Sequence, residues 1–264
     1  MRRLYIFLFA LMLTCLGCQW QMRPSEPTAD GASIVIDRFD RSEHLYLSTG
    51  DFAALQQMKT AYPVQTRTLI EDVLKLGQVD EPDINTRFLL FFQDSTLQAL
   101  MRDVDQQYTD VEDLNVQLSY AFGRLAKLLP GLQFPLVYTQ IGSLDQSIVV
   151  GDGQLGISLD KYLGSNYPLY LHFGYTKQQR ATMTRRFIVP DCLGFYLLSL
   201  FPGADGDEHS HIARIQYTVN RAMGQRIFTS QAVTDVERFM RQNSHISIEE
   251  LLKGNTAVSI PKDN

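Results

Sequence analysis

The sequence predicts an α+β protein: a helix-rich single domain around a small antiparallel β-meander. Two observations predict it. Apolar residues recur at helical spacing along both halves of the chain, and three short β-prone runs with Gly and Asp turns between them occupy the middle. The 264 residues are 45% hydrophobic and 20% charged, which is enough apolar material for one large domain.

The first eighteen residues have the pattern of a bacterial lipoprotein signal. Arg2 and Arg3 precede an unbroken apolar run, residues 4–13, and Gly17 and Cys18 follow it. This run is too short for a transmembrane helix, which needs about 20 apolar residues. We therefore expect removal of residues 1–17 and attachment of acyl chains to Cys18, which would anchor the chain in a membrane.

Residues 18–32 mix polar residues with Pro and Gly and predict a tether, so that the folded domain comprises residues 33–264. The domain begins with alternating apolar and polar residues at 33–40, which predict a strand. Helical spacing then starts at Asp51 and stops at Pro63, and a second helical pattern runs over residues 64–77.

Two further helices each begin with a capping-box pattern, Ser95 with Gln98 and Thr109 with Glu112. The second of these helices is expected to end at Pro130. Its apolar residues share one helix face: Leu114, Leu118, Ala121, Phe122, Leu125, Leu128 and Leu129.

The predicted meander has strands at 134–141, 146–150 and 154–160, and Gly-Asp-Gly at 151–153 is a strong hairpin signal. Helical patterns return after it, with a capping box at Ser247 and Glu250 in the last one. These patterns cover residues 177–188, 191–203, 207–224, 230–242 and 247–254.

The formal net charge of −5 argues against a nucleic-acid partner, which requires a concentrated basic surface. The longest run of basic residues is Arg185–Arg186, which argues against binding through a polybasic face.

No metal, cofactor or catalytic residue is predicted. None of the five histidines fits the HExxH pattern of zinc peptidases, and only His209 and His211, beside Asp207 and Glu208, form a cluster. Cys192 lies in an apolar run and is expected to be a small buried residue. GxSxG, P-loop and GxGxxG motifs are absent from the sequence.

Asp160 ends the last predicted strand and precedes a group of aromatic residues. These aromatic side chains either pack against the domain or form a binding face, since Tyr is enriched at interaction hot spots. The residues that we select as a candidate binding surface are Asp160, Tyr162, Tyr167, Tyr170 and Asp191.

Several segments resemble the gliding-motility lipoprotein B (GldB) family of Bacteroidetes, over about residues 34–205. They are IDRFDR from Ile36, the stretch 92–131, the strand region 134–164 and FIVPD from Phe187, and LDKYLG from Leu159 is the most specific. Residues 207–264 do not resemble the longer tail of the family. The resemblance implies an envelope lipoprotein without an established activity. It also implies a layout similar to that of zincin metallopeptidases, although the helix that would carry the metal motif has no His here.

The expected function is that of a non-catalytic binding or assembly component of the cell envelope. Its expected location is the periplasmic side of the outer membrane, with other envelope proteins as partners. The alternative is a degenerate metal-dependent hydrolase that uses Asp160 with His172, or with His209 and His211.

Overall fold

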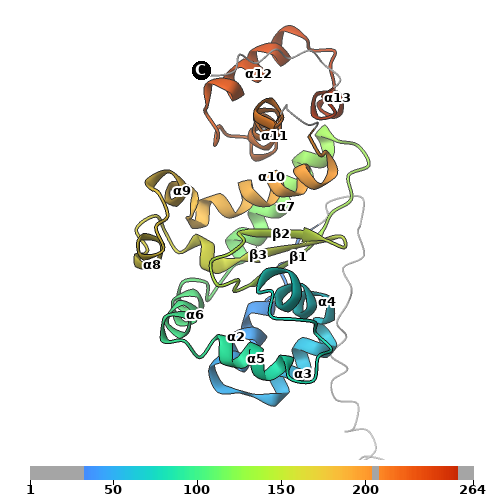
Figure 1. The fold of residues 1–264 in the computed structure, drawn as a ribbon. Helices are drawn as coiled ribbons and strands as arrows, with labels where there is room; N and C mark the ends of the chain where they lie inside the picture. Colours follow the sequence, from blue (N-terminus) through green and yellow to red (C-terminus); the bar gives the residue numbers. More distant parts are fainter. Residues whose placement is uncertain (1–32, 204–207, 255–264) are drawn as a thin grey trace, which may run out of the picture. The chain divides into compact units, whose positions relative to one another are not determined.

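The computed structural model describes residues 33–203 and 208–254 (Figure 1). The expected signal segment 1–17, Cys18, the rest of the tether and Asp207 lie outside these residues. Among the described helices, none is both long enough and apolar enough to cross a bilayer.

The N-terminal part of the domain is helical. Asp51 and Asp94 begin two of its helices by accepting hydrogen bonds from backbone N–H groups of the first turn. The expected Ser95–Gln98 capping box is therefore wrong, and the Gln98 side chain instead donates to the carbonyl oxygens of Leu47 and Phe92. The elements are α2 (Phe39–Thr49), α3 (Phe52–Ala61), α4 (Pro63–Arg67), a π-helical turn (Thr68–Val73), α5 (Ile84–Phe91) and α6 (Ser95–Gln107).

Residues 33–40 do not form the predicted strand. Ile34 and Ile36 are buried as the alternation requires. Their backbone N–H groups, however, donate to the side chains of Ser119 and Asn115 on helix α7 (Glu112–Leu128). Only Asp37 makes a β-bridge, to Tyr138. Because side chains of a helix occupy the donors, no ladder can extend along this segment.

Helix α7 (Glu112–Leu128) buries the predicted apolar face, including Leu114, Leu118 and Phe122. The capping box predicted at its start is absent, because the residue that precedes the helix is Val111, whose side chain cannot accept a capping hydrogen bond. Asp110 instead accepts a hydrogen bond from the Glu112 backbone N–H at 2.8 Å.

The three predicted strands exist, but the sheet is mixed and not a meander. It contains β1 (Leu136–Gln140), β2 (Ile148–Gly151) and β3 (Gln154–Ser158) in the order β1-β3-β2. The β2–β3 hairpin is antiparallel as expected, whereas β3 pairs with β1 in parallel. The reason is the path of the β1–β2 loop (residues 141–147), which crosses the end of β3. As a result β2 does not pair with β1, and β3 occupies the central position of the sheet.

The expected helix over 177–188 is interrupted because Thr184 forms an antiparallel bridge with Leu163. The capping box of Ser247 with Glu250 is present. After a 3₁₀ turn (Leu159–Tyr162), the elements are α8 (Pro168–His172), α9 (Lys177–Thr182), a second 3₁₀ turn (Arg185–Phe187), α10 (Ile188–Leu200), α11 (Glu208–Met223), α12 (Gln231–Gln242) and α13 (Ile248–Leu252).

Helices cover the sheet from two directions (Figure 1). Helix α2 packs against β1, and α3, α5 and α6 pack around α2. On the other side, α10 covers β2 and β3 and packs beside α7, while α11 joins α7 and α10 to α12 and α13. The core is continuous through these layers, and a smaller apolar cluster forms beside it from Leu100, Leu144, Tyr170 and Met183.

Candidate binding cleft at the end of the sheet

Two fully buried carboxyl groups hold the β1–β2 loop. Asp160, directly after β3, accepts a hydrogen bond from the backbone N–H of Gly142 at 2.8 Å and another from that of Leu144 at 2.6 Å. Glu43 on α2 accepts one from the backbone N–H of Ile141 at 2.9 Å. These bonds connect the loop both to the sheet and to a helix far away in sequence.

Burial sets the protonation of both carboxyl groups. It raises the pKa of Asp160, although the hydrogen bonds from Gly142 and Leu144 lower that pKa in part. The pKa of Glu43 is raised well above its usual range by burial, and the nearby Asp40 and Asp160 carboxylates raise it further. Glu43 Oε1 is buried and bonds to no partner among the described residues, which fits a neutral carboxylic acid.

The backbone near Asp160 is left-handed at residues that carry side chains. The φ angles are 50° at Ser143, 67° at Leu144 and 53° at Lys75, which follows the π-helical turn. Left-handed backbone costs a residue with a Cβ about 1–2 kcal/mol, so surrounding contacts must stabilise each of these conformations. Such residues and π-helical turns are both enriched at functional sites.

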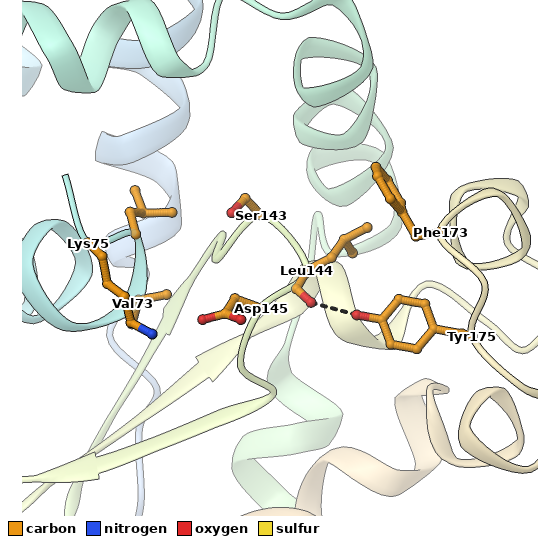
Figure 2. Close-up of a pocket in the computed structure, with 8 residues that line it drawn as sticks. Val73, Lys75, Ser143, Leu144, Asp145, Phe173 and Tyr175 are labelled. Atoms are coloured by element: carbon orange, nitrogen blue, oxygen red, sulfur yellow. Dashed lines mark hydrogen bonds between the residues drawn. The ribbon is translucent and has the colours of Figure 1, made fainter.

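These three residues line one cleft of about 440 Å³, which we call the Leu144 cleft. Figure 2 shows Ser143, Leu144 and Asp145 between Val73 and Lys75 on one side and Phe173 and Tyr175 on the other. Leu74 completes the lining.

Tyr175 and Lys161 fix one wall of the Leu144 cleft. The Tyr175 hydroxyl donates to the carbonyl oxygen of Leu144 at 2.7 Å (Figure 2). Lys161 Nζ lies 3.2 Å from the same oxygen. Lys161 Nζ also donates to the Tyr175 hydroxyl at 2.9 Å and lies 4.5 Å from the centre of its ring. Leu144 is therefore held at its N–H by Asp160 and at its carbonyl by Tyr175 and Lys161.

Gly142 is required by its neighbours. A Cβ at this position would lie 2.9 Å from Ser158 Oγ and 3.3 Å from a Val73 methyl carbon, which is too close for an undisturbed side chain. The loop can therefore approach β3 this closely only with glycine at 142.

None of the three predicted tyrosines lines the Leu144 cleft, and their hydroxyls are engaged inside the protein. The Tyr170 hydroxyl donates to the Asp160 carbonyl oxygen at 2.5 Å, and that of Tyr167 donates to Asp103 at 2.7 Å. Tyr162 donates to Asp191 at 2.8 Å. Burial raises the pKa of each of these three tyrosines, so the hydroxyls stay protonated as donors.

Asp191 is partly buried in the first turn of α10. Burial raises the pKa of this carboxyl to about 7, although the hydrogen bond from Tyr162 lowers it in part. The next residue, Cys192, is completely buried, and burial raises the pKa of its thiol well above the usual range. This thiol is an inert packing group, as the apolar run predicts.

The histidines of the alternative hydrolase do not meet Asp160. His172 and His209 are exposed, and the buried His211 bonds through Nε2 to the Phe201 carbonyl oxygen at 2.8 Å. Both carboxylate oxygens of Asp160 are occupied by backbone N–H groups. Within residues 33–203 and 208–254, no three His, Cys, Asp or Glu side chains gather closely enough to hold a metal ion.

Sequence reasoning finds Asp160 but misses Ser143, Leu144, Lys75 and Tyr175. Asp160 can be found because it ends the predicted strand and, in the structure, lies in the turn that follows β3. The left-handed residues carry no such signal, because Ser and Leu are disfavoured in that conformation and only their fixed partners impose it.

Residues 21–218, more than half of the 264-residue chain, match the family described as gliding motility protein GldB. No curated protein matches the chain. No solved structure matches it.

Proposed function

The chain belongs to the GldB family of gliding-motility lipoproteins, and on this premise we propose that it is a non-catalytic binding component of the cell envelope. Cys18 carries the lipid anchor, and the domain faces the periplasm from the outer membrane. The Leu144 cleft receives a segment of another envelope protein.

The observation that carries the proposal is the convergence of three left-handed residues on a single cleft. The left-handed conformation raises the free energy of the folded state at each of these residues, Ser143, Leu144 and Lys75. A buried carboxylate accepts the hydrogen bonds that fix the loop in this conformation. A loop whose only task was to connect β1 with β2 would not need this conformation. A preformed cleft lowers the entropic cost of binding.

The lining favours a protein segment with an apolar anchor. Phe173 is 55% exposed at the edge of the Leu144 cleft. Lys75 and Asp145 add one charge of each sign to the lining. Exposed aromatic side chains at the edge of a cleft are typical anchors of protein interfaces.

Covalent chemistry at this cleft is not supported by its geometry. Asp160 lies beneath the loop with both oxygens engaged, and the Tyr175 hydroxyl donates to a backbone carbonyl. A general base needs a free lone pair within reach of a substrate proton, which Asp160 does not offer here.

The test is co-purification from the native envelope with Phe173→Ser and with Phe52→Ser as the matched control. Phe52 is 68% exposed on α3 and does not line the Leu144 cleft. We expect Phe173→Ser to lower the yield of one co-purified envelope protein at least tenfold, about 1.4 kcal/mol, and Phe52→Ser to leave it unchanged.

A photo-crosslinking residue in place of Phe173 should capture the same protein, and one in place of Phe52 should not. Equal recovery from wild type and Phe173→Ser, or equal losses from both variants, would contradict a role of the Leu144 cleft in binding.

A further inference from the structure

A second cleft, of about 660 Å³, lies where the chain passes from α9 to α10. Four basic residues line it, Lys177, Arg180, Arg185 and Arg186, together with polar residues that include Thr184. No Asp or Glu contributes to the lining, in a chain with a formal net charge of −5. This basic cleft shares no lining residue with the Leu144 cleft.

Only one of the four cations is neutralised by an acid among the described residues. Arg185 pairs with Asp113 through two hydrogen bonds, one of them 3.1 Å long from Nε. Lys177, Arg180 and Arg186 make no ion pair with any carboxylate that the structure describes. Three like charges around one cleft repel each other unless an anion neutralises them.

The guanidinium groups of the basic cleft are held in place by contacts with the protein itself. Arg180 is half-buried, and its Nε and Nη1 donate to the carbonyl oxygens of Tyr175 and Ser165 at 3.1 and 2.6 Å. The Arg186 guanidinium lies over the Phe187 ring, 5.0 Å from its centre. The Thr184 hydroxyl is buried and has no hydrogen-bond partner in the described part of the chain.

We propose that this basic cleft binds a phosphate group. Two planar guanidinium groups suit the bidentate recognition of phosphate oxygens, and Lys177 adds a point charge. Arg180 is fixed by its backbone contacts before the anion arrives, so less side-chain entropy is lost on binding. The phosphate belongs either to a lipid headgroup or to a soluble compound, and the two sources can be separated experimentally.

The experiment titrates the mature lipidated chain, in nonionic detergent at one fixed salt concentration, by calorimetry. One arm uses inorganic phosphate and the other uses short-chain phosphatidylglycerol. The test variant is Lys177→Gln with Arg186→Gln. The control, Arg102→Gln with Lys127→Gln, makes the same charge change at exposed residues outside the cleft.

We expect the test variant to weaken binding about tenfold or more and the control to bind like wild type. Binding of both probes, lost in the test variant, indicates recognition of phosphate itself. Binding of phosphatidylglycerol alone, with the same loss, assigns the site to a lipid headgroup. Binding of inorganic phosphate alone, with the same loss, assigns it to a soluble compound. The proposal is overturned if neither probe binds, if the test variant binds like wild type, or if the control loses as much affinity.

This experiment is independent of the Leu144 cleft. Phe173→Ser leaves the basic cleft intact and should bind both probes like wild type. Failure of phosphate binding would therefore leave the proposed protein-binding function untouched.

Discussion

Asp191 illustrates how strongly a single carboxyl group depends on its surroundings in this protein. It accepts a hydrogen bond from Tyr162, and burial raises its pKa to about 7. Between about pH 4 and pH 7 the folded chain thus binds a proton at Asp191 more tightly than the unfolded chain does. The free energy of unfolding must decrease as the pH rises through this window.

We predict that Asp191→Asn flattens this pH dependence. The loss attributable to Asp191 between pH 4 and pH 8 is about 2 kcal/mol, after allowance for water at this partly exposed group. Asn is neutral at every pH and can still accept the Tyr162 hydrogen bond. Urea unfolding at the two pH values measures the difference. Glu43 and Asp160 act in the same direction, so a shallower slope remains.

Asp80→Asn, at an exposed position, serves as the control and should keep the slope of wild type. If Asp191→Asn also kept that slope, the buried carboxyl would not be the group that titrates.

Some residues of the candidate site can be predicted from the sequence next to them, and others depend on contacts with distant parts of the chain. Asp160 follows a strand in the sequence, so its importance can be predicted. The partners of the tyrosine hydroxyls cannot, because Tyr167 reaches Asp103 and Tyr162 reaches Asp191 across long stretches of chain. The fold alone brings these pairs together.

The central strand β3 contains a glycine whose missing side chain is filled by a neighbour. A Cβ on Gly156 would lie 2.5 Å from Cζ of Tyr138, whose strand pairs with β3. The Tyr138 ring therefore occupies the space of the absent side chain, an arrangement that compensates glycine in sheets.

We predict that Gly156→Ala lowers the free energy of unfolding by about 2–3 kcal/mol, because the Tyr138 ring must leave its position. The matched control is Gly194→Ala in α10, where a Cβ meets nothing within 4 Å. It should raise stability by about 0.5–1 kcal/mol, since alanine is the better helix former. Chemical denaturation of both variants measures the contrast, and equal effects would refute the role of Tyr138.

Strands were easier to predict than their pairing. The three β-prone runs in the middle of the chain form strands, because β-branched residues and the hairpin signal at 151–153 are local features, whereas the strand predicted at 33–40 does not form. The parallel β1–β3 pairing depends on the path of the β1–β2 loop, which Asp160 and Glu43 determine from outside it. The basic cleft was not predicted either: Lys177 and Arg180 are neighbours on α9, but Arg186 joins them only through the turn of the chain between α9 and α10.

On the scale of the whole molecule, membership of a lipoprotein family implies a lipid anchor, and Cys18 remains its predicted site. We predict that Cys18→Ala moves most of the protein from the membrane to the soluble fraction. Loss of the acyl chains removes about 0.8 kcal/mol per buried CH₂, far more than a protein surface contributes. Cell fractionation measures the distribution.

Cys192→Ala is the control for this experiment, because its thiol is completely buried, and this variant should stay in the membrane. Retention of Cys18→Ala at the wild-type level would exclude Cys18 as the anchor.

The family resemblance could be predicted because the LDKYLG segment is at once distinctive and structurally central. It directly follows β3 and contains the carboxylate that holds the loop and Tyr162. The binding partner could not be predicted in the same way, since its recognition depends on the exposed Phe173 and on backbone conformation.

The contacts of the β1–β2 loop also determine how this surface can be reproduced outside the protein. The carboxyl groups that hold it lie 16 to 98 residues away in sequence. A synthetic peptide of the loop would lack every one of these partners, and its left-handed residues would relax to ordinary turns. An inhibitor designed from this loop as a linear peptide would therefore lose the shape that it was meant to copy, so a mimic must be built on a scaffold that imposes the backbone angles.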